Sequence, residues 1–441
     1  MSVVPPPEVH STLRRHLLAT GHPIVLDLAG SHGDFAKDAL SGDEYLDFAG
    51  FYGSNAVGFQ HPRLRDPEMR ERLALIASIK VGNPEFYTSE LATFVATLER
   101  TVALPTHPHY FFVEGGALAV ENAMKTAMDW KVRKNLARGS MGEVGHEILH
   151  FTKAFHGRAG YTLSVTNTDP AKTMYFPKFD WPRVPCPAAR FPLEGENLVA
   201  TQAAEAECLA AIERAFDERG HRIAAILIEP IQGEGGDNHF RAELLAALRR
   251  IADEREALLI FDEVQSGMGT TGRWWAHQHA AVVPDLLCFA KKLQVGGFFA
   301  SRRIDDVDNV FKVPSRISST WGGALLDMVR ATRILEIIEA EGLVDNAAER
   351  GDELQRGLLA LQAEFPEHIS NVRGRGLMCA LDLPDADSRT ALLKSCFSQR
   401  LLVLPGGVRT LRFRPALSVE PGSVAEALRR LRHAVVAWRA T

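Results

Sequence analysis

The chain has 441 residues, of which 46% are hydrophobic and 24% charged, and its net charge is -5 at pH 7. These values are typical of a soluble globular protein with two or more domains, and they argue against nucleic acid as a partner. The apolar runs are too short to span a membrane, and the five scattered cysteines lack a C-x-x-C spacing, so we expect no membrane segment, no metal site and a reducing, cytoplasmic setting.

The N-terminal part of the chain predicts short strands followed by helices. Apolar residues at 24–28, 34–35 and 45–48 are separated by Gly and Asp, which favours a meander of short strands. The spacing of apolar residues then predicts amphipathic helices at 63–80 and 89–102.

From about residue 109 apolar strands alternate with helical stretches. Strands are predicted at 109–113, 147–151, 223–228, 257–261, 285–290 and 297–300. Helices are predicted at 117–135, 200–220, 241–255 and 272–280. This alternation predicts a mostly parallel sheet flanked by helices. The segment 167–199 contains six prolines, and we expect it to be a long ordered excursion on the surface, near a site or a subunit contact.

The C-terminal part of the chain predicts a second, smaller domain. A helical pattern runs from Trp321 to about residue 363 with a break near Gly342. Strands at 376–382, 401–404 and 411–414 and helices at 387–399 and 421–438 follow. We therefore expect an α/β fold with a large domain at 76–325 and a smaller α+β domain that both termini build, from residues 1–75 and 326–441.

Two charged residues follow neighbouring buried strands. Asp262 ends the apolar run 257–261, and Lys291 follows the run 286–290. In open α/β sheets the carboxyl ends of the strands form the edge where ligands bind. A lysine that forms a Schiff base and an acid that keeps a pyridine nitrogen protonated are what pyridoxal 5'-phosphate (PLP) requires. A structural ion pair between Asp262 and Lys291, without a cofactor, is the alternative.

Other residues at the same predicted edge have suitable chemistry for a cofactor site. The strand 109–113 leads through Gly116 and Ala117 into a helix, where backbone N–H groups can bind a phosphate. Phe155 is placed to stack on a flat ring, and Arg158 can bind a carboxylate with two hydrogen bonds. The alternatives are an ordinary turn, a core phenylalanine and a surface arginine.

Two glutamates follow the strand 223–228. Glu229 comes directly after it, at the expected ligand edge, and Glu234 lies five residues further along. Solvated loop acids are the alternative for both. We take Glu229, with Lys291 and Asp262, as the candidate catalytic residues.

Taken together and in order, these motifs resemble a known family. The set consists of Gly115-Gly116-Ala117, Glu121-Asn122-Ala123, Phe155-His156-Gly157-Arg158, Glu229-Pro230-Ile231-Gln232-Gly233-Glu234-Gly235-Gly236, Phe261-Asp262-Glu263-Val264-Gln265, Lys291, Ser319-Thr320-Trp321-Gly322-Gly323 and Arg373-Gly374-Arg375-Gly376-Leu377. It resembles the class III, or ω-, aminotransferases of PLP fold type I, over about residues 20–435. Within this family the stretches 111–122, 176–182 and 412–415 are most similar to the lysine ε-aminotransferases.

The resemblance implies a role for each residue that would hold PLP. Lys291 would bind the cofactor covalently and move a proton between the substrate carbon and the cofactor. The other implied contacts are Asp262 with the pyridine nitrogen, Gln265 with the phenolic oxygen, Phe155 and Val264 with the two ring faces, Gly116 and Ala117 with the phosphate, and Thr320 with the phosphate of the neighbouring subunit. The last contact implies an obligatory homodimer.

The resemblance also implies the substrates, namely transfer of the ε-amino group of L-lysine to 2-oxoglutarate in a ping-pong reaction that yields 2-aminoadipate 6-semialdehyde and L-glutamate. Arg412 would bind the keto acid's carboxylate nearest the ring, and Arg158 the distant carboxylate of either substrate. Because lysine reacts through an end without a carboxylate, Arg412 would then be an unpaired buried cation, and Glu234 would neutralise it. The alternatives are an ornithine or 4-aminobutyrate aminotransferase, a PLP-dependent isomerase or decarboxylase, and a non-enzymatic protein of the same fold.

Overall fold

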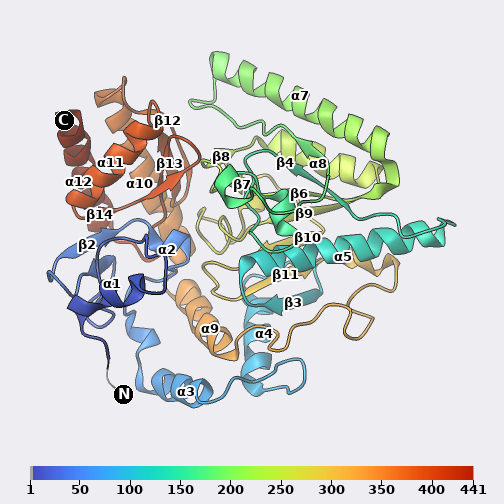
Figure 1. The fold of residues 1–441 in the computed structure, drawn as a ribbon, viewed down its shortest axis with the longest axis horizontal. Helices are drawn as coiled ribbons and strands as arrows, with labels where there is room; N and C mark the ends of the chain where they lie inside the picture. Colours follow the sequence, from blue (N-terminus) through green and yellow to red (C-terminus); the bar gives the residue numbers. More distant parts are fainter. Residues whose placement is uncertain (1–2, 441) are drawn as a thin grey trace.

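A mixed sheet forms the centre of the larger part of the molecule (Figure 1). The computed structural model describes residues 3–440. Within them this sheet contains, in spatial order, β3 (His109–Val113), β11 (Gly296–Ala300), β10 (Leu286–Phe289), β9 (Leu258–Asp262), β6 (Ile223–Ile228), β4 (Glu147–Phe151) and β5 (Arg183–Val184). β11 is antiparallel to its neighbours β10 and β3, and the pairs from β10 to β5 are parallel. The carboxyl ends of the parallel strands therefore meet at one edge.

Helices cover both faces of this sheet. They are α4 (Ser89–Thr101), α5 (Gly116–Ala137), α7 (Gly195–Arg219), α8 (Ala242–Glu254) and α9 (Leu325–Ala340). In β9, Leu258 and Ile260 pack in the core that includes residues of α5, whereas Leu259 and Phe261 pack in the core with residues of α7 and α8. A strand buried on both faces requires an uninterrupted apolar run, which is why the sequence pattern located these strands well.

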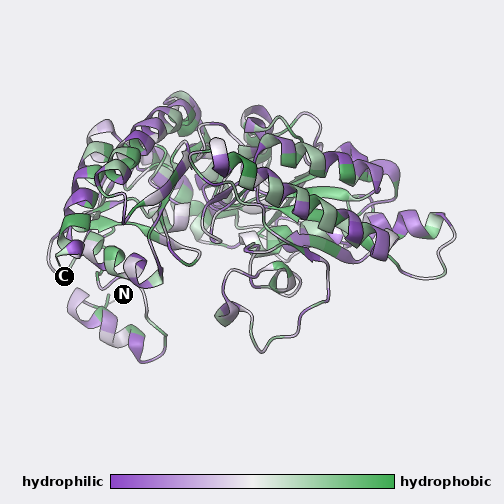
Figure 2. Cartoon of the chain, turned by 90° about the horizontal axis from the view of Figure 1, so that it is seen from above, coloured by the Kyte–Doolittle hydropathy of each residue, from purple (hydrophilic) through white to green (hydrophobic). Residues whose placement is uncertain are grey.

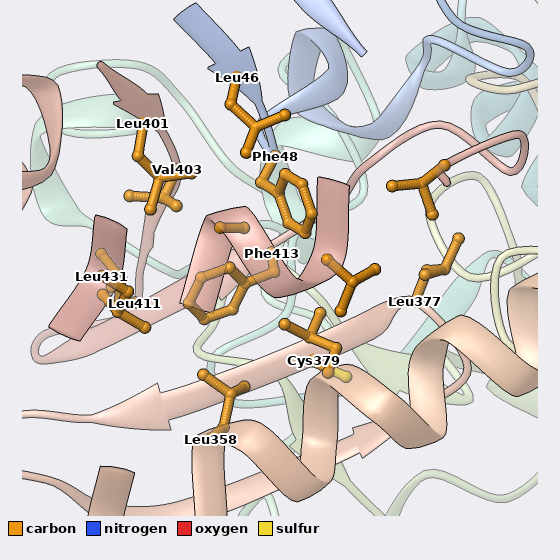
Figure 3. Close-up of a cluster of buried hydrophobic side chains, with 14 of the residues drawn as sticks. Leu46, Phe48, Leu358, Leu377, Cys379, Leu401, Val403, Leu411, Phe413 and Leu431 are labelled. Carbon is orange, nitrogen blue, oxygen red and sulfur yellow. The ribbon is translucent and has the colours of Figure 1, made fainter. Parts of the chain in front are cut away.

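The two ends of the chain build a second core together. Its sheets contain β1 (Phe35–Lys37), β2 (Glu44–Asp47) and β14 (Leu401–Leu402), and β12 (Ser370–Arg375), β13 (Met378–Asp382), β16 (Thr410–Phe413) and β15 (Leu404–Gly406). Leu46 of β2 pairs with Leu401 of β14. Figure 3 shows Leu46 and Phe48 close to Leu401 and Phe413. Residues of the N-terminal strands thus pack in the same core as residues of the C-terminal segment.

Helices also surround this second core. Those that pack on it are α10 (Leu343–Glu364), α11 (Ala386–Ser398) and α12 (Pro421–Arg439). Of the N-terminal helices, α1 (Pro6–Arg14) buries no residue, α2 (Gly50–Gly53) is a short turn after β2, and α3 (Pro67–Ala77) packs in the core beside β10 instead. α9 belongs to both halves, because Met328 packs in the core beside β10 and Ile337 packs in the core of the terminal segments. The boundaries at 75/76 and 325/326 therefore stay a prediction.

Short elements complete the fold. They are α6 (Thr162–Val165), β7 (Ile231–Gln232), β8 (Asn238–His239) and the 3-10 turns Pro62–Leu64, Pro170–Lys172, Gly220–Arg222, Ala276–His279 and Arg302–Asp306. In Figure 2 the long helices alternate between hydrophilic and hydrophobic colour along their length, as expected for helices with one face on the core. Within residues 3–440 no helix combines the length and apolar composition needed to cross a membrane.

The structure contradicts two of the predicted elements. The helix at 272–280 is wrong, because Gly272 has a φ of 77° and only Ala276–His279 form a 3-10 turn. Glu263 accepts hydrogen bonds from the backbone of that turn and fixes it there. The strand at 24–28 is also wrong, since its ladder is a single bridge at Leu26. The backbone N–H of Val25, next to Leu26, donates to the side chain of Asp38 and not to a backbone carbonyl of a partner strand.

Candidate active site

The sheet register brings the predicted acids and the lysine to one edge. Asp262, the last residue of β9, pairs with Cys288 of β10, and Lys291 lies three residues beyond that partner. On the other side, Phe261 pairs with Ile228, so Glu229 follows directly at the end of β6. The residues that the sequence predicts at the ends of separate strands are therefore neighbours across the sheet.

Asp262 is buried and held by two hydrogen bonds. Its Oδ1 accepts from the backbone N–H of Val264 at 3.0 Å, and its Oδ2 lies 2.8 Å from Nδ1 of His156. Because a carboxylate oxygen accepts, Nδ1 of His156 donates in this contact. Among the residues described, the ion-pair partner of Asp262 is His156 and not Lys291. The structural ion pair with Lys291, considered as an alternative above, is therefore absent from this part of the chain.

Lys291 has an amine that is easily deprotonated. Burial, and then the positive charges of Arg412 and Arg414, together lower the pKa of Lys291 from 10.5 to about 8. Within residues 3–440 its Nζ makes no hydrogen bond and no ion pair. An amine in this state is suited to attack a carbonyl carbon and to carry a proton.

The N-terminus of α5 lies against the same edge. Gly115 has a φ of 89°, which favours glycine, and Gly116 is the first helical residue. A Cβ on Gly116 would lie 2.9 Å from Cγ1 of Val264, so the turn after β9 packs directly on this helix start. The first backbone N–H groups of a helix have no partner within it, and they attract anions such as phosphate.

Glu229 connects two loops beside Asp262. Its Oε1 accepts from the backbone N–H of Phe155 and its Oε2 from that of Gly233, each at 3.0 Å. Burial raises the pKa of Glu229 to about 7; the positive charge of His156 opposes this rise, and the negative charge of Asp262 adds to it. The two hydrogen bonds to Glu229 fix the backbone positions of Phe155 and Gly233. A catalytic role for Glu229 stays a prediction.

Arg412 is fully buried and paired with Glu234. Its Nη2 lies 2.8 Å from Oε2 of Glu234, and its Nη1 donates to Oε1 of Gln265 at 3.1 Å. The backbone carbonyl of Pro405 accepts two further hydrogen bonds from the same guanidinium. Arg414, which directly follows β16, also donates to Gln265 and pairs with the buried carboxylate of Asp237.

A pocket reaches these residues through Lys172, which lines it and contacts Glu234 at 2.8 Å. It has a volume of about 900 Å³, and Arg158, Lys125, Lys172 and Lys178 line it together with one acid, Glu121. Arg158 is exposed, so its guanidinium is accessible from the pocket. A surplus of cations on the wall favours substrates that carry carboxylates.

The structure brings most of the predicted site residues together, with one outlier. Thr320 is exposed on the loop between the turn Arg302–Asp306 and α9. The structure gives His156 the role of orienting Asp262. No role was predicted for Lys172 or Arg414, although Arg414 lies in the stretch 412–415 that resembles the lysine ε-aminotransferases.

The residues at this edge fit PLP. Lys291 supplies an amine without a competing partner, and the buried, hydrogen-bonded carboxylate of Asp262 supplies a fixed negative charge for a protonated pyridine nitrogen. Gly116 lets the start of α5 pack closely on Val264, and the first backbone N–H groups of this helix can bind a phosphate. Phe155, tied by its backbone to Glu229, supplies an aromatic face.

Comparisons with known proteins agree with this geometry. The profile of the family described as aminotransferase class-III matches residues 18–435. The L-lysine-epsilon aminotransferase of Mycobacterium tuberculosis is 50% identical over 432 residues, 98% of this chain and 96% of that protein. That of Streptomyces clavuligerus is 46% identical over 434 residues, 98% of this chain and 94% of that protein.

A solved structure of the lysine aminotransferase from M. tuberculosis superimposes with a TM-score of 0.96 and 49% identity, covering 99% of this chain and 100% of the other. The predicted fold type and the predicted need for PLP are thereby confirmed. The chain belongs to the class III aminotransferases and is a PLP-dependent aminotransferase of fold type I.

Proposed function

We propose that this aminotransferase moves the ε-amino group of L-lysine to 2-oxoglutarate. The products would be 2-aminoadipate 6-semialdehyde and L-glutamate, formed in two alternating half-reactions. The observation that carries the proposal is the pairing of the buried Arg412 with Glu234 at 2.8 Å. The relatives named as L-lysine-epsilon aminotransferases support the same substrate.

When bound, PLP would supply a protonated pyridine ring that accepts electrons from the substrate carbon. Lys291 would hold it covalently, and its Nζ would move the proton. Asp262 would keep the pyridine nitrogen protonated, with His156 fixing the carboxylate. The other holding residues we propose are Gln265, Phe155, Val264, Gly116 and Ala117.

A transaminase with two unlike substrates must bind each of them without leaving a buried charge unpaired. The pairing of Arg412 with Glu234 can meet this requirement. Lysine presents its ε-amine to the ring without a carboxylate nearby, and Glu234 then neutralises Arg412. 2-Oxoglutarate brings a carboxylate to the same place, so Glu234 has to release Arg412. Arg158, on the wall of the 900 Å³ pocket, would bind the distant carboxylate of both substrates. One pocket can therefore accept both without leaving a buried charge unpaired.

A panel of amino donors with 2-oxoglutarate as acceptor tests this function. Lysine should give the highest kcat/KM, and its semialdehyde product should cyclise to an imine. In Glu234→Ala, Arg412 stays unpaired when lysine binds, so the preference for lysine over α-amino donors should fall by about 10- to 100-fold. If ornithine or 4-aminobutyrate is the better donor, the assignment of lysine is wrong and the family assignment stands. A Glu234→Ala variant with the full preference for lysine would contradict the role of Glu234.

We also propose a cytoplasmic homodimer. Thr320 and Trp321 are exposed, and the backbone N–H of Asn83 contacts the carbonyl of Trp321 at 3.3 Å. The exposed Phe86 and Tyr87 lie in the same loop as Asn83. Exposed aromatic side chains beside the predicted phosphate ligand Thr320 fit a subunit contact. Sedimentation should give twice the mass of one chain, and a monomer with full activity would contradict this assembly.

A further inference from the structure

Glu234 lies between two cations. Its Oε2 contacts Nη2 of Arg412 and its Oε1 contacts Nζ of Lys172, each at 2.8 Å. Burial would raise the pKa of Glu234, but Arg412 and then Lys172 outweigh it, and the pKa lies below its ordinary value. Each carboxylate oxygen therefore has a charged partner of its own.

Lys172 is held in place and does not extend freely into solvent. It ends the 3-10 turn Pro170–Lys172, and its Nζ also donates to Oγ1 of Thr168 at 3.2 Å. The same Nζ lies 5.2 Å from the centre of the Phe155 ring. Three independent contacts, to Thr168, Phe155 and Glu234, thus fix this ammonium group on the wall of the pocket.

The two substrates place different demands on Glu234. With an amino donor whose reacting end carries no carboxylate, Glu234 can keep both cations as partners. A keto acid whose carboxylate binds Arg412 displaces Glu234 from that side. The side chain of Glu234 is only 26% exposed, so a carboxylate without a partner there would be strongly unfavourable.

We propose that Lys172 is a positioning residue that retains Glu234 after its carboxylate has left Arg412, and so stabilises the state that binds the keto acid. This inference rests on the proposed function above. While the keto acid is bound, Lys172 is then the remaining partner of Glu234. While the amino donor is bound, Glu234 has two partners, Arg412 and Lys172. Loss of Lys172 should therefore affect the two half-reactions unequally.

Lys172→Met tests this asymmetry. The two half-reactions of the holoenzyme are followed separately in single turnovers by cofactor absorbance, and binding of glutarate, an unreactive dicarboxylate, is measured by calorimetry. We expect kcat/KM for 2-oxoglutarate and glutarate affinity to fall about 10-fold or more, and kcat/KM for lysine to change less than about 3-fold. Lys172→Arg, which keeps the charge, should restore most of the loss.

Lys125→Met is the matched control. Lys125 lines the same pocket but pairs with Glu121 at 3.4 Å and does not contact Glu234. Its removal reports the general effect of losing one positive charge on both half-reactions. An equal loss in both half-reactions of Lys172→Met would mean that Lys172 binds the distant carboxylate of both substrates or is merely structural, and would overturn the proposal.

The same variants made in a Glu234→Gln background separate this proposal from the one on which it rests. If Lys172 acts through Glu234, Lys172→Met should cause no additional selective loss in that background. A selective loss that persists there overturns the inference about Lys172. If Glu234→Gln itself leaves the ratio of the two half-reactions unchanged, the exchange of Glu234 at Arg412 fails, and the proposed function fails with it.

Discussion

Replacing Lys291 by alanine or by arginine should lower kcat with the proposed substrates, lysine and 2-oxoglutarate, by about 10³-fold or more. A positioned proton carrier contributes on the order of 10²- to 10⁴-fold by itself, and covalent attachment of the cofactor is lost as well. Lys291→Arg keeps the positive charge beside Arg412, so it separates the loss of the amine from a change in electrostatics. Steady-state rates give the effect, and thermal unfolding checks that both variants are folded. Substantial turnover in either variant would contradict the role of Lys291.

The neighbouring lysine makes this test specific. Lys292 is buried and donates to the carbonyls of Asn55 at 3.0 Å and Pro415 at 3.2 Å, so its Nζ is engaged in the core. Burial lowers the pKa of Lys292 to about 7 and that of Lys291 to about 8, so pKa alone does not distinguish the two amines. After borohydride reduction of the PLP-loaded protein, the adduct should map to position 291. An adduct at 292 would overturn the assignment.

The pH dependence of cofactor attachment follows from the same amine. The neutral form of Lys291 attacks the cofactor's carbonyl carbon, and its pKa of about 8 means that this form predominates only above pH 8. Attachment of PLP to the apoprotein should therefore accelerate as pH rises through about 8 and level off above it. A rate that is flat from pH 7 to pH 10 would contradict a lysine with this pKa.

The inner strands of the central sheet could be predicted from the sequence because they are buried on both faces, whereas no strand was predicted at the edge strand β5, whose Arg183 is exposed. In β9 four successive apolar residues supply two cores, so even a short window identifies the strand. The segment 272–280 has a helical spacing of apolar residues, but the buried acceptor Glu263, which binds the backbone N–H groups of Ala276 and His277, decides its conformation. Such a tertiary contact leaves no periodic signal in the local sequence.

The residues of the site also divide into those that could be predicted from the sequence and those that could not. Asp262 and Lys291 stand out because a charge directly after a buried strand is costly without a partner. His156 and Asp262 are 106 positions apart, and only the parallel neighbours β4, β6 and β9 bring them into contact. Lys172 lies in the proline-rich excursion 167–199, where no regular pattern specifies which side chain turns towards Glu234. Residues that act through another residue were thus harder to predict than those that end a strand.

Asp262→Asn should lower kcat by roughly 10²- to 10³-fold, because it removes a fixed charge aimed at the place where charge develops during the reaction. His156→Leu should have a smaller effect, since Asp262 keeps its charge and its hydrogen bond from the N–H of Val264. A hydrogen bond to a charged group contributes about 1.5–3 kcal/mol, which corresponds to roughly 10- to 100-fold. Rates at saturating substrates, corrected for bound cofactor, measure both effects. A larger loss for His156→Leu than for Asp262→Asn would contradict this order.

Asp285→Asn is the control for the general effect of removing the charge of a buried carboxylate. Asp285 is as buried as Asp262, at 5% against 4% exposed, and it lies directly before β10, at the opposite end of the strand from Lys291. It pairs with Arg249 at 2.9 Å and with Arg303 at 3.1 Å, so its loss should reduce thermal stability. Its distance from the carboxyl edge should leave the kcat of the folded fraction within about 2-fold. If both asparagine variants lost activity equally, burial of a carboxylate would explain the loss, and Asp262 would have no special part in the chemistry.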